Sequence, residues 1–82
     1  MIYPFQMRAA RGLLGLSQDE LARRAELSVV TVKRLEAGGT EIRGSAQSVA
    51  RIQRALEAQG IVFIDQDEAH GPGVRLRKRL RE

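Results

Sequence analysis

Two short helix patterns separated by a turn of two residues constrain this chain more than any other feature. The first begins at Ser17, whose hydroxyl forms a capping box with Glu20. The second begins at Ser28, a favourable N-cap residue, and ends at Gly38-Gly39. Only Glu26-Leu27 lies between them. Helices joined by so short a turn cross steeply, so this spacing predicts a helix-turn-helix.

A further helix is expected on each side of this pair. Apolar residues recur with helical spacing in residues 5–14, which Gly15 ends, and after Ser45, in a helix that Gly60 ends. The recurring residues are Met7, Ala10 and Leu14 in the first of these helices and Val49, Ile52 and Leu56 in the second. Four helices around a shared apolar core are therefore expected.

The last part of the chain has the pattern of a β-hairpin. Residues 61–64 are β-branched or aromatic, and residues 74–77 alternate apolar and basic side chains. Gly71-Pro72-Gly73 is a turn signal between them. The expected fold is mainly α, with a four-helix domain over residues 1–60. A C-terminal β-hairpin follows in residues 61–82 and ends in charged residues.

The composition limits the classes of function. The chain has 82 residues, enough for one domain, and no Cys, which excludes a disulfide framework, a thiolate zinc site and a cysteine nucleophile. It has no run of about 18 apolar residues and no signal-peptide pattern at its start, so a cytoplasmic location is expected. The net charge of +4, with 12 Arg and 2 Lys, suits nucleic acid, although membranes and acidic proteins attract it too.

Residues 16–38 resemble the phage Cro/repressor-type (XRE) helix-turn-helix family. The positions that match the family's pattern are Gln18, Ala22, Leu27, Ser28, Val32, Leu35 and Glu36. The resemblance extends over about residues 5–60 and implies a transcription regulator that binds double-stranded DNA. Glu26 stands where the family often has Gly, which predicts a positive φ and a slightly strained turn. The hairpin is a second departure, since many relatives have a fifth helix there.

A helical wheel divides the second helix of the pair into two faces. One face carries Ser28, Thr31, Val32 and Leu35, and the other carries Val29, Val30, Lys33, Arg34 and Ala37. Two valines beside two cations are unusual on a solvated surface. They suit the major groove, where Arg34 can bind guanine bidentately and a valine can contact a thymine methyl. Base contacts are therefore expected from Val29, Val30, Lys33 and Arg34.

Phosphate contacts are expected at the two helix starts and in the loop after the pair. A helix N-terminus attracts phosphate, and the resembled family makes such contacts from the same positions. The residues assigned to phosphate are Gln18, Ser28, Thr31 and Arg43. A solvated charge is the alternative for Arg34 and Arg43, and a core edge or protein interface for the two valines. The other helical arginines are expected to be mainly solvated: Arg8, Arg11, Arg23, Arg24, Arg51 and Arg54.

The first strand of the hairpin predicts a dimer. Ile61 and Phe63 lie on one face and Val62 and Ile64 on the other, and a strand with two apolar faces is usually buried on both. Four short helices can cover only one face, so a second subunit is expected on the other. The residues assigned to this interface are Ile61, Val62, Phe63, Ile64, Val74 and Leu76. The alternative is that the hairpin folds back on the fourth helix of its own chain.

No metal or cofactor is expected. His70 is the only histidine and has no ligating partner near it in the sequence, and Asp65, Asp67 and Glu68 do not match a calcium loop. These residues are interpreted as a solvated loop. The cations of the tail either contact DNA or form a solvated strand face and chain end; they are Arg75, Arg77, Lys78, Arg79 and Arg81.

The sequence thus predicts a homodimeric repressor that binds an inverted-repeat DNA operator and no membrane. One alternative is an antitoxin whose C-terminal tail also binds a partner protein. Another is a protein-interaction module that binds through Val29-Val30. An enzyme is not expected, because no nucleophile–base set, catalytic carboxylate pair or metal cluster can be assembled.

Overall fold

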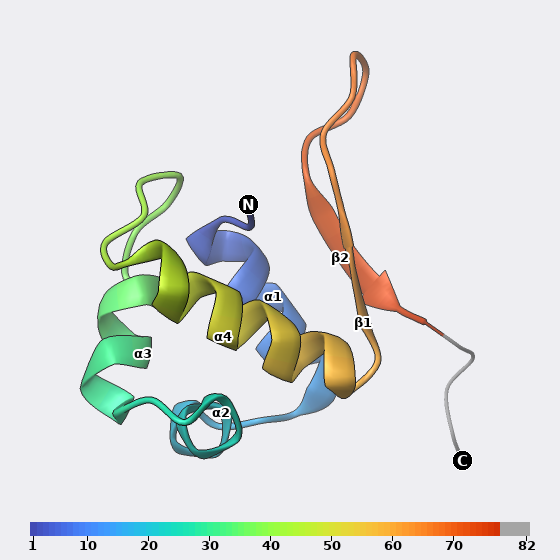
Figure 1. Ribbon diagram of the computed structural model, residues 1–82. Coiled ribbons are helices and arrows are strands. Elements are labelled where there is room, and N and C mark those ends of the chain that lie inside the picture. The colour runs from blue at the N-terminus through green and yellow to red at the C-terminus, as the bar shows by residue number, and fades with distance from the viewer. Residues whose placement is uncertain (78–82) are drawn as a thin grey trace.

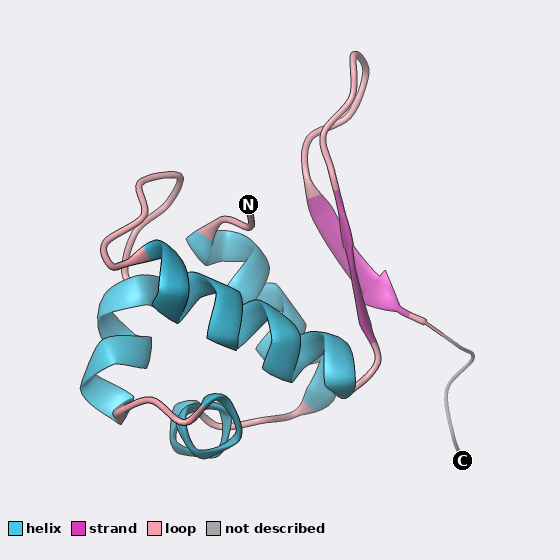
Figure 2. Ribbon diagram, in the orientation of Figure 1, coloured by secondary structure: helices cyan, strands magenta, loops and turns pink. Residues whose placement is uncertain are grey.

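The computed structural model describes residues 1–77 as four helices followed by a two-stranded antiparallel sheet (Figure 1). The elements are α1 (Pro4–Leu14), α2 (Gln18–Ala25), α3 (Val29–Glu36), α4 (Ala46–Ala58), β1 (Ile61–Ile64) and β2 (Gly73–Leu76). The helices surround one core, and the hairpin stands beside them (Figure 2). The mainly α fold with a C-terminal hairpin is confirmed. The charged end, including Lys78, Arg79 and Arg81, lies outside the described residues.

Serine side chains begin three of the helices. The hydroxyls of Ser17, Ser28 and Ser45 each accept the backbone N–H three residues later, at 3.0 to 3.2 Å. At the start of α2 the capping box is complete, because the Ser17 N–H also donates to the Glu20 carboxylate at 2.8 Å. Hydrogen bonds from the Ser17 backbone and then its side chain lower the pKa of Glu20. The predicted capping box is therefore confirmed.

Two helices end at a residue in the left-handed conformation. Gly15 has a φ of 69°, and Glu26 has a φ of 59°. After α2 the N–H of Leu27 donates to the carbonyl of Ala22 at 2.9 Å, and the N–H of Glu26 donates to that of Arg23, which is a Schellman motif. Glu26 is the only non-glycine residue with a positive φ among residues 1–77. The positive φ predicted at Glu26 is confirmed.

The core lies between the four helices and reaches the first strand. Its fully buried members of largest volume are Met7, Leu21, Val32, Leu35, Val49, Ile52, Leu56 and Ile61. All of the periodic apolar residues predicted from sequence are buried except Leu14, which packs at the edge. Ile2 also belongs to the core, which the sequence did not predict because it precedes the first helix.

The strand register decides which face of the hairpin is free. Ile61 pairs with Leu76 and Phe63 with Val74, and all four side chains belong to or pack against the helical core. Because side chains alternate along a strand, the outer face carries the other two pairs. These are Val62 with Arg75 and Ile64 with Gly73.

The predicted dimer interface therefore needs correction. Ile61 is only 2% exposed within its own chain and has no surface to offer a second subunit. Phe63, Val74 and Leu76 face the same way and are partly buried against the core. The hairpin folds back on its own helices, which was the alternative, and only Val62 and Ile64 of the six assigned residues lie on the outer face.

A buried glutamine fixes the hairpin to the first helix. Gln6, 3% exposed, accepts the N–H of Tyr3 at 2.8 Å and donates to the carbonyl of Gly73 at 2.9 Å. On the other side, the Arg77 guanidinium donates to the carbonyl of Glu57 at the end of α4, at 2.7 Å. The hairpin is thus held to both α1 and α4. Arg77, expected at DNA or in solvent, is engaged with the helix end.

The hairpin reverses direction earlier than the sequence predicted. The N–H of Asp67 donates to the carbonyl of His70, and the Asp67 carboxylate accepts the N–H groups of Ala69 and His70. These bonds close the turn at residues 67–70. Gly71-Pro72-Gly73, predicted as the turn, lies in and before the returning strand instead. An aspartate that can bond its own following backbone competes well with glycine and proline as a turn former.

Replacing Glu26 with Gly is expected to raise the free energy of unfolding by about 1 kcal/mol, because glycine adopts a positive φ without the steric cost of a Cβ. Glu26→Ala is the matched control, since it removes the same carboxylate and keeps the Cβ. Urea and thermal unfolding measure the difference. Equal stability of the two variants would contradict the assignment of strain to this residue.

Candidate nucleic-acid interface

Helices α2 and α3 form the motif that the sequence predicted. Each has eight residues, and the connection is Glu26, Leu27 and the N-cap Ser28 (Figure 1). Leu21, Ala22 and Ala25 of α2 and Val32 and Leu35 of α3 are buried where the two helices pack. This packing leaves one long side of α3 uncovered by the other elements of residues 1–77.

The uncovered side of α3 matches most of the predicted base-reading face. Val30 is 60% exposed, and Lys33 and Arg34 are also exposed and make no ion pair within residues 1–77. Val29 differs from the prediction, because it is half-buried and packs against the core. The exposed face of α3 therefore carries one apolar side chain, Val30, beside the cations Lys33 and Arg34.

The residues assigned to phosphate lie in different settings. Ser28 caps α3, and its hydroxyl also bonds that of Thr31 at 3.0 Å. Gln18 donates one N–H of its amide to Glu36 at 3.1 Å, and its second N–H has no acceptor in the part of the chain that the structure describes. Arg43 is half-exposed in the loop after α3, and within residues 1–77 its only ion pair is a 3.8 Å contact with Glu41. Gln18 and Arg43 therefore keep donors for another group, whereas only one of the hydroxyls of Ser28 and Thr31 does, because the bond between them uses the other's hydrogen.

A buried carboxylate joins the motif to the first helix. Glu36, at the end of α3, is 3% exposed. Arg11 of α1 donates to both of its oxygens, with Nε at 3.0 Å from Oε2 and Nη2 at 3.0 Å from Oε1. With Gln18 added, three helices meet at one side chain. A bidentate arginine–carboxylate pair has strict geometry, so it fixes the orientation of α3.

Two arginines expected to be solvated are instead structural. Arg11 binds Glu36 and the carbonyl of Leu16, and Arg8 donates to the carbonyls of Glu36 and Gly38, at 2.7 Å for the latter. These bonds satisfy carbonyls that a helix end leaves free. The signal that could have revealed them is Glu36 itself, because it follows the inward-facing Val32 by four residues on the same side of the helix, and a buried carboxylate needs a cation.

The comparisons with known proteins agree with this geometry. A helix-turn-helix family model matches residues 7–58, which is more than half of the chain. The chain belongs to the Cro/repressor-type helix-turn-helix family. The family consists of DNA-binding transcription regulators, in which the helix at the position of α3 enters the major groove. No curated protein matches the chain.

The family match ends with α4 and leaves the hairpin outside it. Two other findings bear on the expected partners. Of the helices in residues 1–77, none is both long and apolar enough to span a membrane. Within the same residues, no group of three or more His, Cys, Asp or Glu side chains is arranged to hold a metal ion.

Arg11→Leu is expected to lower the free energy of unfolding by about 3 kcal/mol, because it leaves the buried Glu36 carboxylate without its charged partner. Arg23→Leu is the matched control. Arg23 is exposed on α2 and should change stability by less than about 0.5 kcal/mol. Urea unfolding of both variants measures the contrast. Similar stability of the two would show that the pair does not hold the helices together.

Proposed function

We propose that this protein is a homodimeric transcriptional repressor that reads an inverted-repeat operator through α3 and acts in the cytoplasm. The observation that carries the proposal is the outer face of α3, where Val30 is 60% exposed between the cations Lys33 and Arg34. An apolar side chain of this size loses its contact with water when it meets a thymine methyl. The neighbouring cations suit guanine and phosphate.

The roles of the side chains follow from their chemistry. Arg34 binds the O6 and N7 acceptors of a guanine, and Lys33 contacts a base edge or a phosphate. Gln18, Ser28, Thr31 and Arg43 donate to backbone phosphates and set the position of α3 in the groove. Val29 contributes only a small part of the surface that contacts DNA, because most of its side chain already lies against the core.

A homodimer supplies a second copy of α3, which contacts the other half of the operator. One α3 contacts only a few base pairs, so a single copy binds weakly and with little selectivity. Two copies on a two-fold axis place their recognition helices about 34 Å apart, one turn of B-DNA. Occupation of a promoter by such a dimer excludes polymerase without any catalytic step.

Selection of bound sequences from random duplex DNA tests the proposal. The wild type is expected to enrich an inverted repeat, and Arg34→Ala should lose about 2 kcal/mol of preference at one symmetric position. Arg23→Ala is the control, because Arg23 is exposed on α2 but has no assigned contact. Enrichment of no sequence by the wild type would reject DNA reading, and enrichment of a single half-site would reject the dimer.

The contact of Val30 is tested by removing one methyl group from the DNA. Replacing the contacted thymine with uracil is expected to weaken wild-type binding about fourfold, the value of one buried methyl group. Val30→Ala should bind more weakly and respond little to the replacement. Gel-shift titrations on the selected operator measure both. An equal response of the two proteins would place the thymine contact elsewhere.

A further inference from the structure

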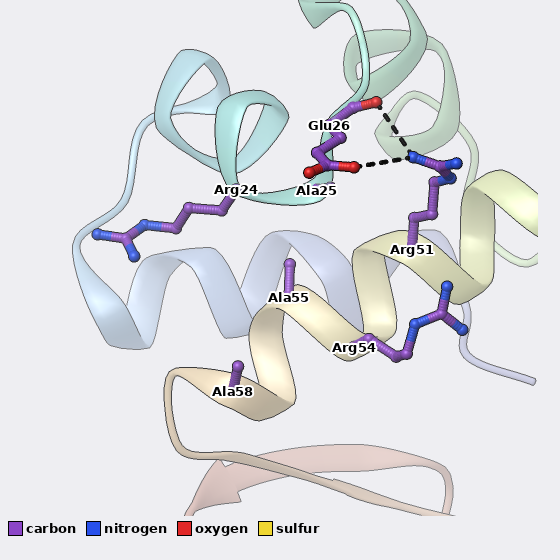
Figure 3. A pocket seen from close by; sticks show the side chains of 7 residues that line it. All are labelled: Arg24, Ala25, Glu26, Arg51, Arg54, Ala55 and Ala58. Carbon is purple, nitrogen blue, oxygen red and sulfur yellow. Dashed lines mark hydrogen bonds and ion pairs between the residues drawn. The ribbon is translucent and has the colours of Figure 1, made fainter.

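A second basic surface lies between α2 and α4. It is an open groove of about 380 Å³ lined by Arg24, Ala25, Glu26, Arg51, Arg54, Ala55 and Ala58. Figure 3 shows Ala55 between Arg24 and Arg54, with Ala58 nearer the end of α4. We call this the α2–α4 groove. No residue of α3 lines it, so it is distinct from the proposed DNA-reading face.

The groove has more positive charge than its own residues neutralise. Arg51 is held by Glu26, with 3.5 Å between its Nη1 and both the carboxylate Oε1 and the backbone carbonyl (Figure 3). Arg24 and Arg54 make no ion pair or hydrogen bond with any part of residues 1–77 that the structure describes. Two cations therefore remain beside a floor of small apolar side chains, which suits an acidic segment that also carries an apolar residue.

The chain itself contains such a segment at the end of the hairpin. The hairpin tip, residues 65–70, is exposed throughout and carries Asp65, Asp67 and Glu68. Backbone N–H groups of Ala69 and then His70 lower the pKa of Asp67, so this carboxylate is ionised at neutral pH. Next to Asp65 stands Ile64, which is 39% exposed on the outer face of β1. Acidic and apolar groups thus occur together, as the groove requires.

The tip cannot reach the groove of its own chain. The hairpin is fixed to α1 through Gln6 and to the end of α4 through Arg77. Figure 1 shows the tip projecting beyond the helices at the opposite end of the molecule from α2. A tip that is held away from its own groove and complements it in charge fits the groove of a second copy.

We infer that two copies of this chain associate by inserting each hairpin tip into the partner's α2–α4 groove. Asp65 and Glu68 meet Arg24 and Arg54, and Ile64 covers Ala55 and Ala58. The exchange is reciprocal, so the contact occurs twice about a two-fold axis. The inference rests on the proposed homodimer and assigns its interface. Exposed ion pairs are screened by salt, so association should weaken as ionic strength rises.

Charge reversal tests the pairing without DNA. The groove variant is Arg24→Glu/Arg54→Glu, and the tip variant is Asp65→Arg/Glu68→Arg, which keeps Asp67 because it closes the turn. Each is expected to raise the dissociation constant of the dimer at least about tenfold, because like charges then face each other. Arg23→Glu/Arg75→Glu is the control for the groove variant, with the same change of charge at exposed positions outside both surfaces. Sedimentation velocity over a concentration series measures association.

Recombining the reversed charges distinguishes the outcomes. An equimolar mixture of groove and tip variants should associate like the wild type, since each tip then meets a groove of opposite charge. A monomeric wild type would reject the homodimer and this interface together. A wild-type dimer that neither variant weakens would leave the homodimer standing and reject this interface. Weakened variants that do not recover on mixing would also reject it.

Discussion

The Glu36 carboxylate determines how the three helices around it are arranged. It lies at the end of α3 and is bound by Arg11 from α1 and Gln18 from α2. A carboxylate at 3% exposure is tolerated only when its oxygens have hydrogen-bond partners, so the helices cannot shift without losing these bonds. The other end of α3 is fixed by the Ser28 cap and the buried Leu21 and Val32. The helix that we propose reads DNA is therefore held in position before DNA is bound, which lowers the entropic cost of binding.

The local signals in the sequence predicted the helices and the motif well. Capping serines and apolar periodicity act within a few residues, so Ser17, Ser28 and Ser45 gave the starts of α2, α3 and α4 directly. Glu26 also revealed its positive φ, because it replaces a glycine at a fixed place in the family pattern. The outward side of α3 followed from the wheel, apart from Val29, whose place at the first turn lets it reach the core.

Contacts between distant residues were not predictable in this way. Arg11 and Glu36 are 25 residues apart, and Gln6 and Gly73 are 67 apart. A helical arginine looks the same in sequence whether it is solvated or binds a buried carboxylate. The strand register was equally hidden, because it depends on the turn at Asp67 and His70. The apolar residues of β1 indicated that both of its faces are buried. The pairing with Val74 and Leu76 determines which of the two faces packs against the helices.

The Gln6 side chain also determines the order in which the chain can complete its fold during synthesis. Its amide accepts from Tyr3 and donates to Gly73, so the start and the end of the described chain meet at one buried polar group. α1 precedes β2 along the chain, so this amide obtains its backbone acceptor only after β2 has been made. Until then the helix exposes the surface that the hairpin later covers. The packing around α1 is therefore completed only after the hairpin has been synthesised.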